Sequence, residues 1–391
     1  MNFGFVFRRS VLCALVLLAL MAGSATPAFA QGTPLETVWQ NNYAPVGHSL
    51  DTRASMVTAD GGLAVLALQR PLSSGKDRSN DRGWIGVFGS DGRMQEQFSF
   101  ALREGEGAVG EVDAFATSAE GGYVVAGLSL SEESWAVHVA RGGATRGLAS
   151  LGRARVAFIL PLADGSFALG GRNGRDLFAM QLRPDGQVVW ERKLDRGFDD
   201  IFLAGVPVPG GVLMLEHSGM REQFFMRDAV VGLTVMSAAD AAIRAPVFSM
   251  PGRAGALAAS SPGFGVLVDT GAGVKQVLSF LRINGDFKPA QPAREVLTIN
   301  FSLERARLAA LSGGEFLALA IDGGKLIGLR LARDGSTAAR WESEAGRVFL
   351  HPDVQAQGDT AYWVASELKT REDQRGARSM VYVARVAVPS R

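Results

Sequence analysis

The sequence predicts an all-β fold, a seven-bladed β-propeller with four-stranded antiparallel blades, and three observations support it. Glycine-containing turns open short apolar segments seven times along the 391 residues. In four of these units a second turn follows the first after 21 residues. The chain has 48 glycines, 47% hydrophobic and 20% charged residues, which supports a packed core and excludes a disordered or collagen-like protein.

Residues 1–30 have the composition of a secretory signal peptide. Arg8 and Arg9 precede an apolar run, and residues 28–30 (Ala-Phe-Ala) form an A-x-A cleavage site. The apolar run is shorter than the roughly 20 residues that a membrane-spanning helix needs. We therefore expect cleavage after Ala30, a periplasmic or secreted protein, and no membrane span in the mature chain. The two arginines also fit a loose twin-arginine pattern, but an ordinary Sec signal is favoured.

The remaining residues, 31–391, are predicted to form a single β-propeller domain. The only cysteine, Cys13, lies in the signal segment, so the mature chain would have neither disulfides nor thiolate metal sites. With 40 basic and 39 acidic side chains the chain is almost neutral, which excludes a nucleic-acid-binding surface. We expect a monomer.

Each unit is predicted to contain four strands joined by tight turns. Asp-Gly, Asn-Gly and Gly-Gly pairs adopt positive φ easily and close hairpins. In the third unit, for example, strand-length apolar runs at 167–169 and 177–182 are followed by a turn and by a strand that ends at Trp190. Trp39 and Trp341 occupy the same repeat position. The first turns contain Gly61, Gly121, Gly165, Gly210, Gly263, Gly313 and Gly358.

Two units depart from this pattern. In the first unit the polar stretch 73–81 separates the second and third strands and indicates a lengthened hairpin loop. In the fourth unit the segment 224–236 shows no clean second turn.

The two ends of the chain are predicted to meet. The last unit has strand-like segments at 353–357, 361–366 and 380–388, but no fourth strand. The segment from Leu35 to Gln40 has the tryptophan of a fourth strand. We expect it to complete the last blade and so remove the open sheet edges of the ring.

These repeats resemble those of secreted bacterial β-propeller repeat proteins. The resemblance rests on the segment Gly121-Gly-Tyr-Val-Val-Ala-Gly127 and on the segment from Leu182 to Trp190, which contains Asp185-Gly186. It covers essentially the whole mature chain and implies the fold and export. It implies no activity, because propellers of this kind serve many functions. The similarity to quinoprotein propellers is one of outline only.

No established catalytic or cofactor motif occurs in the sequence. It contains no G-x-S-x-G elbow, P-loop or calcium loop, and none of the four histidines of the chain has a partner at metal-ligand spacing. His138 lies within an alternating strand and is interpreted as structural, whereas His48, near the entry to the first blade, is a better functional candidate. No metal and no other cofactor is predicted.

Charged residues precede the first turn of most units by six to twelve positions. If the ring closes, they surround the mouth of the central channel, where propeller ligands bind. Arginines there could hold a carboxylate or phosphate, and paired acids could hold a cation, although the same residues could simply brace neighbouring blades. The candidates are His48, Asp51, Arg53, Glu111, Asp113, Arg153, Arg155, Asp199, Asp200, Arg305 and Arg307.

The favoured hypothesis is a non-catalytic binding or scaffolding module for a small ligand or protein partner. The alternative is an enzyme with its site at the channel mouth, either a metal-assisted hydrolase or lactonase, or a quinone-dependent oxidoreductase. A lactonase would use His48, Asp51, Asp113 and Asp200 around a cation. A sensor domain that works only in a complex is a third hypothesis.

Overall fold

The computed structural model describes most of the chain beyond the predicted signal peptide, which itself lies outside the described residues. The described residues are 35–74, 77–102, 108–222, 225–237, 242–243, 246–261, 263–271, 275–300, 306–358, 360–370 and 377–388.

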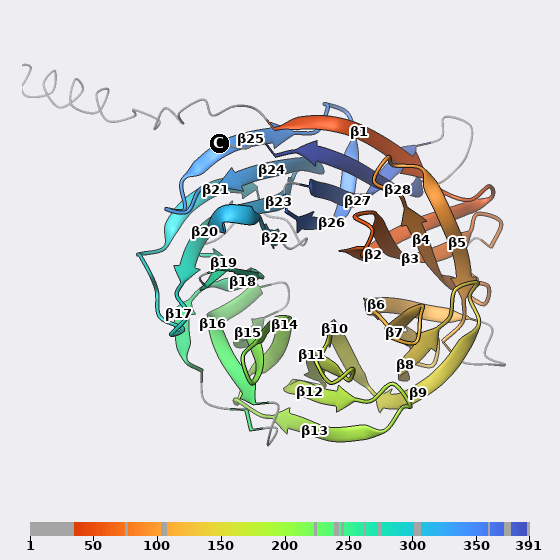
Figure 1. Ribbon diagram of the computed structural model, residues 1–391, viewed down its shortest axis with the longest axis horizontal. Coiled ribbons are helices and arrows are strands. Elements are labelled where there is room, and N and C mark those ends of the chain that lie inside the picture. The colour runs from red at the N-terminus through yellow and green to blue at the C-terminus, as the bar shows by residue number, and fades with distance from the viewer. Residues whose placement is uncertain are drawn as a thin grey trace, which may run out of the picture.

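Within these residues the chain forms seven four-stranded antiparallel sheets, arranged as blades around a common central axis (Figure 1). The prediction of a seven-bladed propeller is confirmed. In each blade the strands lie side by side in chain order, from the axis outward, except in the last blade.

The first four blades follow one another along the chain. Blade 1 contains β2 (His48–Val57), β3 (Leu63–Pro71), β4 (Arg82–Phe88) and β5 (Met94–Phe100). Blade 2 contains β6 (Val109–Thr117), β7 (Tyr123–Ser129), β8 (Ser134–Val139) and β9 (Thr145–Gly152). Blade 3 contains β10 (Ala154–Pro161), β11 (Phe167–Asn173), β12 (Asp176–Leu182) and β13 (Val188–Leu194). Blade 4 contains β14 (Asp199–Val208), β15 (Gly211–Glu222), β16 (Phe225–Ser237) and β17 (Phe248–Pro251).

The other three blades complete the ring. Blade 5 contains β18 (Arg253–Ser260), β19 (Gly263–Asp269), β20 (Lys275–Ile283) and β21 (Arg294–Asn300). Blade 6 contains β22 (Arg307–Ala310), the 3-10 helix η1 (Ser312–Gly314), β23 (Phe316–Asp322), β24 (Lys325–Leu331) and β25 (Thr337–Glu342). Blade 7 contains β26 (Val348–Gln357), β27 (Thr360–Thr370), β28 (Ala377–Ala387) and β1 (Glu36–Tyr43).

Strand β1 closes the ring as predicted. It pairs antiparallel with β28 from Glu36 opposite Ala387 to Tyr43 opposite Val381, so blade 7 has the order β1-β28-β27-β26. The indole Nε1 of Trp39 also donates a hydrogen bond to the Ser90 carbonyl of blade 1, at 3.1 Å. The first strand therefore joins the last blade and contacts the first.

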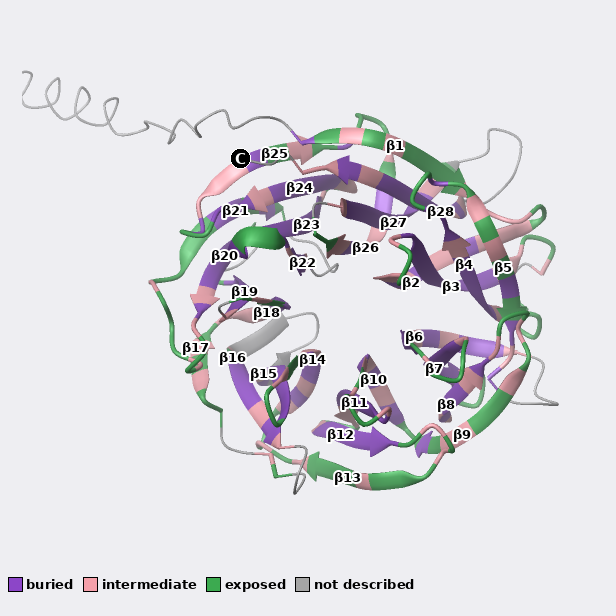
Figure 2. Ribbon diagram, in the orientation of Figure 1, coloured by how far each residue is buried: buried purple, intermediate pink, exposed green. Residues whose placement is uncertain are grey.

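The core lies between the blades, where the middle strands are buried on both faces. All seven residues of β7 are buried, whereas the outermost strand of blade 3, β13, is largely exposed (Figure 2). Strands that pack between two neighbouring sheets read as continuous apolar runs rather than alternating ones. Trp39, Trp190 and Trp341 lie on β1, β13 and β25, the outermost strands of three blades.

The two units that depart from the repeat pattern in sequence are also irregular in structure. In blade 1 the described residues of the polar stretch, 73–74 and 77–81, belong to no strand and lie between β3 and β4 in the chain. In blade 4 the hairpin strands β15 and β16 have 12 and 13 residues, but the outermost strand β17 has only four.

Removing β1 should destabilise the ring. We expect a chain that begins at Ala44 to unfold at a lower temperature than one that begins at Leu35, because the edge of β28 loses its partner. Losing the hydrogen bonds and the burial of an eight-residue strand should lower the unfolding free energy by about 3 kcal/mol or more. Thermal unfolding followed by circular dichroism measures this, and equal midpoints for the two chains would refute closure by β1.

Candidate functional site

The innermost strands are irregular at a shared position. In blades 1, 2, 3, 4 and 5 the register of the inner strand against its neighbour skips one residue at this position. In blade 7 it skips two, His351 and Pro352. A β-bulge leaves the extra residue unpaired and changes the direction of its side chain. The bulged residues of blades 1 to 5 are Arg53, Asp113, Ala157, Leu203 and Gly255.

All five bulged residues line the central channel. The channel contains a cavity of about 500 Å³ and, nearer the start of the inner strands, a second cavity of about 340 Å³. The two cavities share a ring of lining residues, which consists of the five bulged residues and Arg307, the first residue of β22. The bulges therefore determine which side chains a molecule in the channel would meet.

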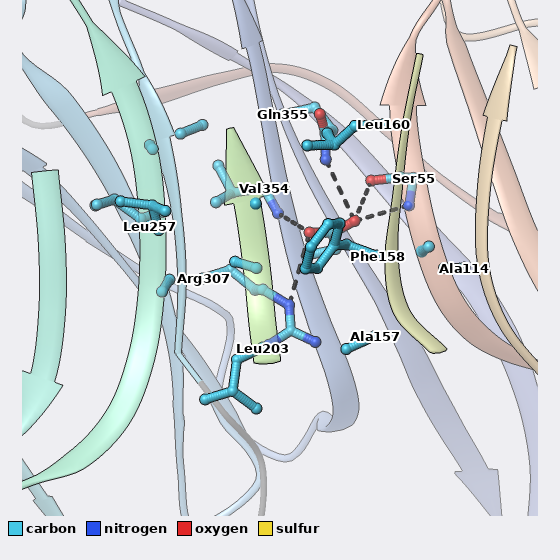
Figure 3. Close-up of a pocket in the computed structure, with 18 of the residues that line it drawn as sticks. Ser55, Ala114, Ala157, Phe158, Leu160, Leu203, Leu257, Arg307, Val354 and Gln355 are labelled. Atoms are coloured by element: carbon cyan, nitrogen blue, oxygen red, sulfur yellow. Dashed lines mark hydrogen bonds and ion pairs between the residues drawn. The ribbon is translucent and has the colours of Figure 1, made fainter. Parts of the chain in front are cut away.

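Together with His351, which lines only the smaller cavity, this ring of residues has two chemically different halves. The polar arc consists of Arg307, His351, Arg53 and Asp113, from the adjacent blades 6, 7, 1 and 2. The apolar arc consists of Ala157, Leu203 and Gly255, from blades 3, 4 and 5. Beyond the apolar arc, Phe158, Leu160 and Leu257 continue the apolar wall of the larger cavity (Figure 3).

Asp353 links three inner strands of the polar side. Its Oδ2 accepts hydrogen bonds from the backbone nitrogen and the hydroxyl of Ser55, both at 2.7 Å. Its Oδ1 accepts one from the Val354 nitrogen at 3.0 Å and lies 3.9 Å from Nε of Arg307. Figure 3 shows these interactions converging from Ser55, Val354, Gln355 and Arg307. Asp353 thus fixes blades 6, 7 and 1 relative to one another.

Asp113 is the most perturbed acid of the channel. Its side chain is only 12% exposed, its Oδ2 has no hydrogen-bond partner, and Nη2 of Arg155 lies 3.4 Å from its Oδ1. Burial raises the pKa of Asp113 to about 7, against the opposing effect of the Arg53 charge. Glu111 on the same strand pairs with Arg155. Burial and the charge of Arg172 lower the pKa of the Arg155 guanidinium.

Arg53 and His351 meet between blades 1 and 7. Nη1 of Arg53 lies 3.5 Å from Nε2 of His351, and Nε of Arg53 is buried without a hydrogen-bond partner. His351 has φ of +52°, a left-handed conformation that is uncommon outside glycine. Strained residues of this kind cluster at functional sites.

The structure brings together five of the predicted site residues, Arg53, Glu111, Asp113, Arg155 and Arg307, which all line the smaller cavity. Five others lie outside both cavities, and Arg305 lies outside the described residues. Asp51 pairs with Arg70, Asp199 pairs with Arg175, and the exposed Arg153 has no role in the channel wall. His48 Nδ1 contacts the Val46 carbonyl, and the buried Asp200 accepts a hydrogen bond from the Arg196 nitrogen.

Sequence reasoning missed His351, Asp353, Ser55 and the whole apolar arc. A search for charged residues does not find Ser55 or the apolar arc, and the positions of His351 and Asp353 in blade 7 depend on a two-residue bulge. A better signal was available in the repeat spacing. The bulged residue lies eight positions before the first turn glycine in blades 1, 2, 3 and 5, and seven positions before it in blade 4. Aligning the units on these glycines would have placed Ala157, Leu203 and Gly255 beside Arg53 and Asp113.

The channel offers groups for anion binding and for proton transfer. Among the described residues, no three His, Cys, Asp or Glu side chains are grouped so that they could hold a metal ion. Of the four residues proposed for a lactonase, only Asp113 lines the channel cavities.

Within the described part of the chain, no helix has the length and apolar character that a membrane crossing requires.

Comparisons with known proteins find likeness in the fold. No protein-family model and no curated protein sequence matches the chain. The WD40 domain of Pan2 from Neurospora crassa is similar over 93% of this chain and 98% of that one, with a TM-score of 0.54 and 12% identity. The polysaccharide lyase Uly1 gives 0.53 and 10% identity, over 93% of this chain and 94% of that one.

A puromycin hydrolase is also similar, with a TM-score of 0.54 and 14% identity over 90% of this chain and 55% of that one. At such identities the likeness extends to the propeller fold alone, and these three proteins have different functions.

Replacing Asp113 by Asn should change how stability depends on pH. A carboxyl group with a raised folded-state pKa binds more protons in the folded than in the unfolded chain between about pH 4 and pH 7, so stability falls as the pH rises through that window. Asp113→Asn removes this loss. Relative to wild type, it should gain up to about 4 kcal/mol in unfolding free energy between pH 4 and pH 8.

Urea unfolding of both proteins at intervals from pH 4 to pH 8 measures this gain. Asp286→Asn, in an exposed turn, is the matched control and should follow the wild type. A constant difference between Asp113→Asn and wild type at every pH would show that the carboxyl does not titrate as stated.

Proposed function

We propose that the protein is an exported binding module that holds a small ligand in its central channel without transforming it. The main support is the ring of bulged residues, which five consecutive blades direct into one cavity. Bulges interrupt the strand pairing that holds a blade together, and they are common next to binding sites. A cavity of about 500 Å³ is within the range of small-molecule sites.

The side chains of the channel suit binding more than scaffolding. A residue that only braces two blades has its polar groups satisfied by the neighbouring blade, as Asp353 has. Asp113 Oδ2 and Arg53 Nε have no such partner. Buried polar groups without partners are costly, and a ligand that bonds to them recovers this cost.

Export remains part of the proposal. It rests on the basic residues, apolar run and A-x-A site of residues 1–30, which predict cleavage after Ala30 and a periplasmic or secreted location. A module in that location would meet small molecules or protein partners from outside the cytoplasm.

An enzyme with its site in the channel is the second candidate, and one observation favours it. Asp113 has a pKa of about 7 in a cavity that it shares with His351 and three arginines, and perturbed carboxyl groups in cavities are common among catalytic acids and bases. Substrate turnover that Asp113→Asn abolishes would favour this candidate over the binding module.

Filling the channel should abolish ligand capture. Ala157 lines both cavities, so Ala157→Leu reduces the free space between the two arcs. The wild type, equilibrated with a bacterial cell extract and analysed by native mass spectrometry, should retain a small molecule that Ala157→Leu retains at least about tenfold less. Ala119→Leu, in an exposed turn, is the control and should match the wild type. Equal retention by Ala157→Leu, or no retained molecule at all, would refute channel binding.

A further inference from the structure

The two arginines shared by both channel cavities have few partners for their guanidinium groups. Among the described residues, no carboxylate lies within ion-pair distance of Arg53, whose one hydrogen-bonding neighbour is His351. Arg307 has a single acidic neighbour, Asp353, at the long distance of 3.9 Å from its Nε. A partly buried guanidinium presents several donors in one plane, and a carboxylate satisfies two of them at once.

The acidic groups of the polar side offset only part of the charge of these arginines, because Asp353 is an ion-pair neighbour of Arg307 alone. Glu111 is engaged by Arg155, and Asp353 is held by the Ser55 nitrogen and hydroxyl. Asp113 is partly protonated at neutral pH because burial raises its pKa to about 7. An unbalanced positive charge therefore remains at the polar arc, between blades 6 and 1.

In the larger cavity, the described lining residues of blades 3 to 5 include no polar side chain, and Arg155 of blade 3 lines only the smaller cavity. Ala157, Leu203 and Gly255 form the apolar arc, and Phe158 and Leu257 extend it deeper into the larger cavity. A polar group placed against this wall would lose its hydrogen bonds to water without replacement. The end of a ligand that lies in the larger cavity against blades 3 to 5 must therefore be apolar.

From these three observations we infer that the channel binds an organic monocarboxylate, with its carboxylate at Arg53 and Arg307 and its apolar body against Leu203 and Phe158. This inference rests on the proposed binding function and names its ligand class. A second negative charge on the ligand would approach Asp353 and Glu111, which disfavours dianions such as phosphate.

Isothermal titration of the purified chain with 4-phenylbutyrate tests the inference. The neutral amide of the same acid, acetate, and inorganic phosphate serve as comparison ligands at equal ionic strength. We expect 4-phenylbutyrate to bind at least about tenfold more tightly than its amide, since charge-assisted hydrogen bonds are stronger than neutral ones. Acetate should bind at least about tenfold more weakly because it lacks the apolar body.

Variants assign the effect to the two arginines. Arg53→Gln and Arg307→Gln should each remove most of the preference for the acid over the amide. Arg93→Gln, whose side chain is 89% exposed, should retain it. Thermal unfolding of each variant confirms that it is folded. If one of the two arginine variants does not fold, the other still tests the inference.

Each outcome decides a separate point. Equal binding of the acid and its amide would contradict recognition of the carboxylate by the two arginines. Phosphate binding as tightly as 4-phenylbutyrate would contradict the contribution of the apolar body to affinity. If none of these ligands binds while the channel still retains a molecule from the extract, the ligand class is wrong and the binding module stands. If the channel retains no molecule either, both proposals fail.

Discussion

Closure of the ring by the pairing of β1 with β28 is the constraint on which the other features depend. A propeller blade buries its faces only between two neighbours, so an open ring would expose two blade faces and two sheet edges to solvent. Eight residues near the start of the chain, Glu36–Tyr43, provide the fourth strand of the last blade. The contact of Trp39 with Ser90 extends the same strand to the first blade. The first and the last strand of the described chain are thereby held within one sheet.

A closed ring makes the seven innermost strands the wall of one channel. Regular strands would direct their side chains between the blades, into the core that buries Trp84 and Trp363. The bulges at Arg53, Asp113, Ala157, Leu203 and Gly255 instead direct one residue per blade toward the axis. The fold thus adds one irregular layer of residues to a channel wall that regularly paired residues such as Phe158 and Leu257 continue.

Burial in that layer gives Asp113 its chemical character, whereas the arginines beside it are only partly buried. Asp113 would be a fully ionised surface acid if it were exposed, but burial holds its pKa near 7. Arg53 and Arg307 add two guanidinium groups to the same layer. The polar arc is therefore electropositive at neutral pH. Because the apolar arc lies opposite, a ligand with one charged and one apolar end can bind in only one orientation.

The sequence by itself determined the architecture, including the number of blades, the four strands of each blade and closure by the N-terminal strand. It could do so because turns that need positive φ impose glycine, and burial between blades imposes apolar runs at a constant spacing. It also singled out Arg53, Glu111, Asp113, Arg155 and Arg307, which line the smaller cavity. Only the tertiary structure separated these from His48, Asp51, Arg153, Asp199 and Asp200 and added His351, Asp353 and the apolar arc. A one-residue bulge is invisible in the alternation of a single strand, and the channel side chains come from blades far apart in the chain.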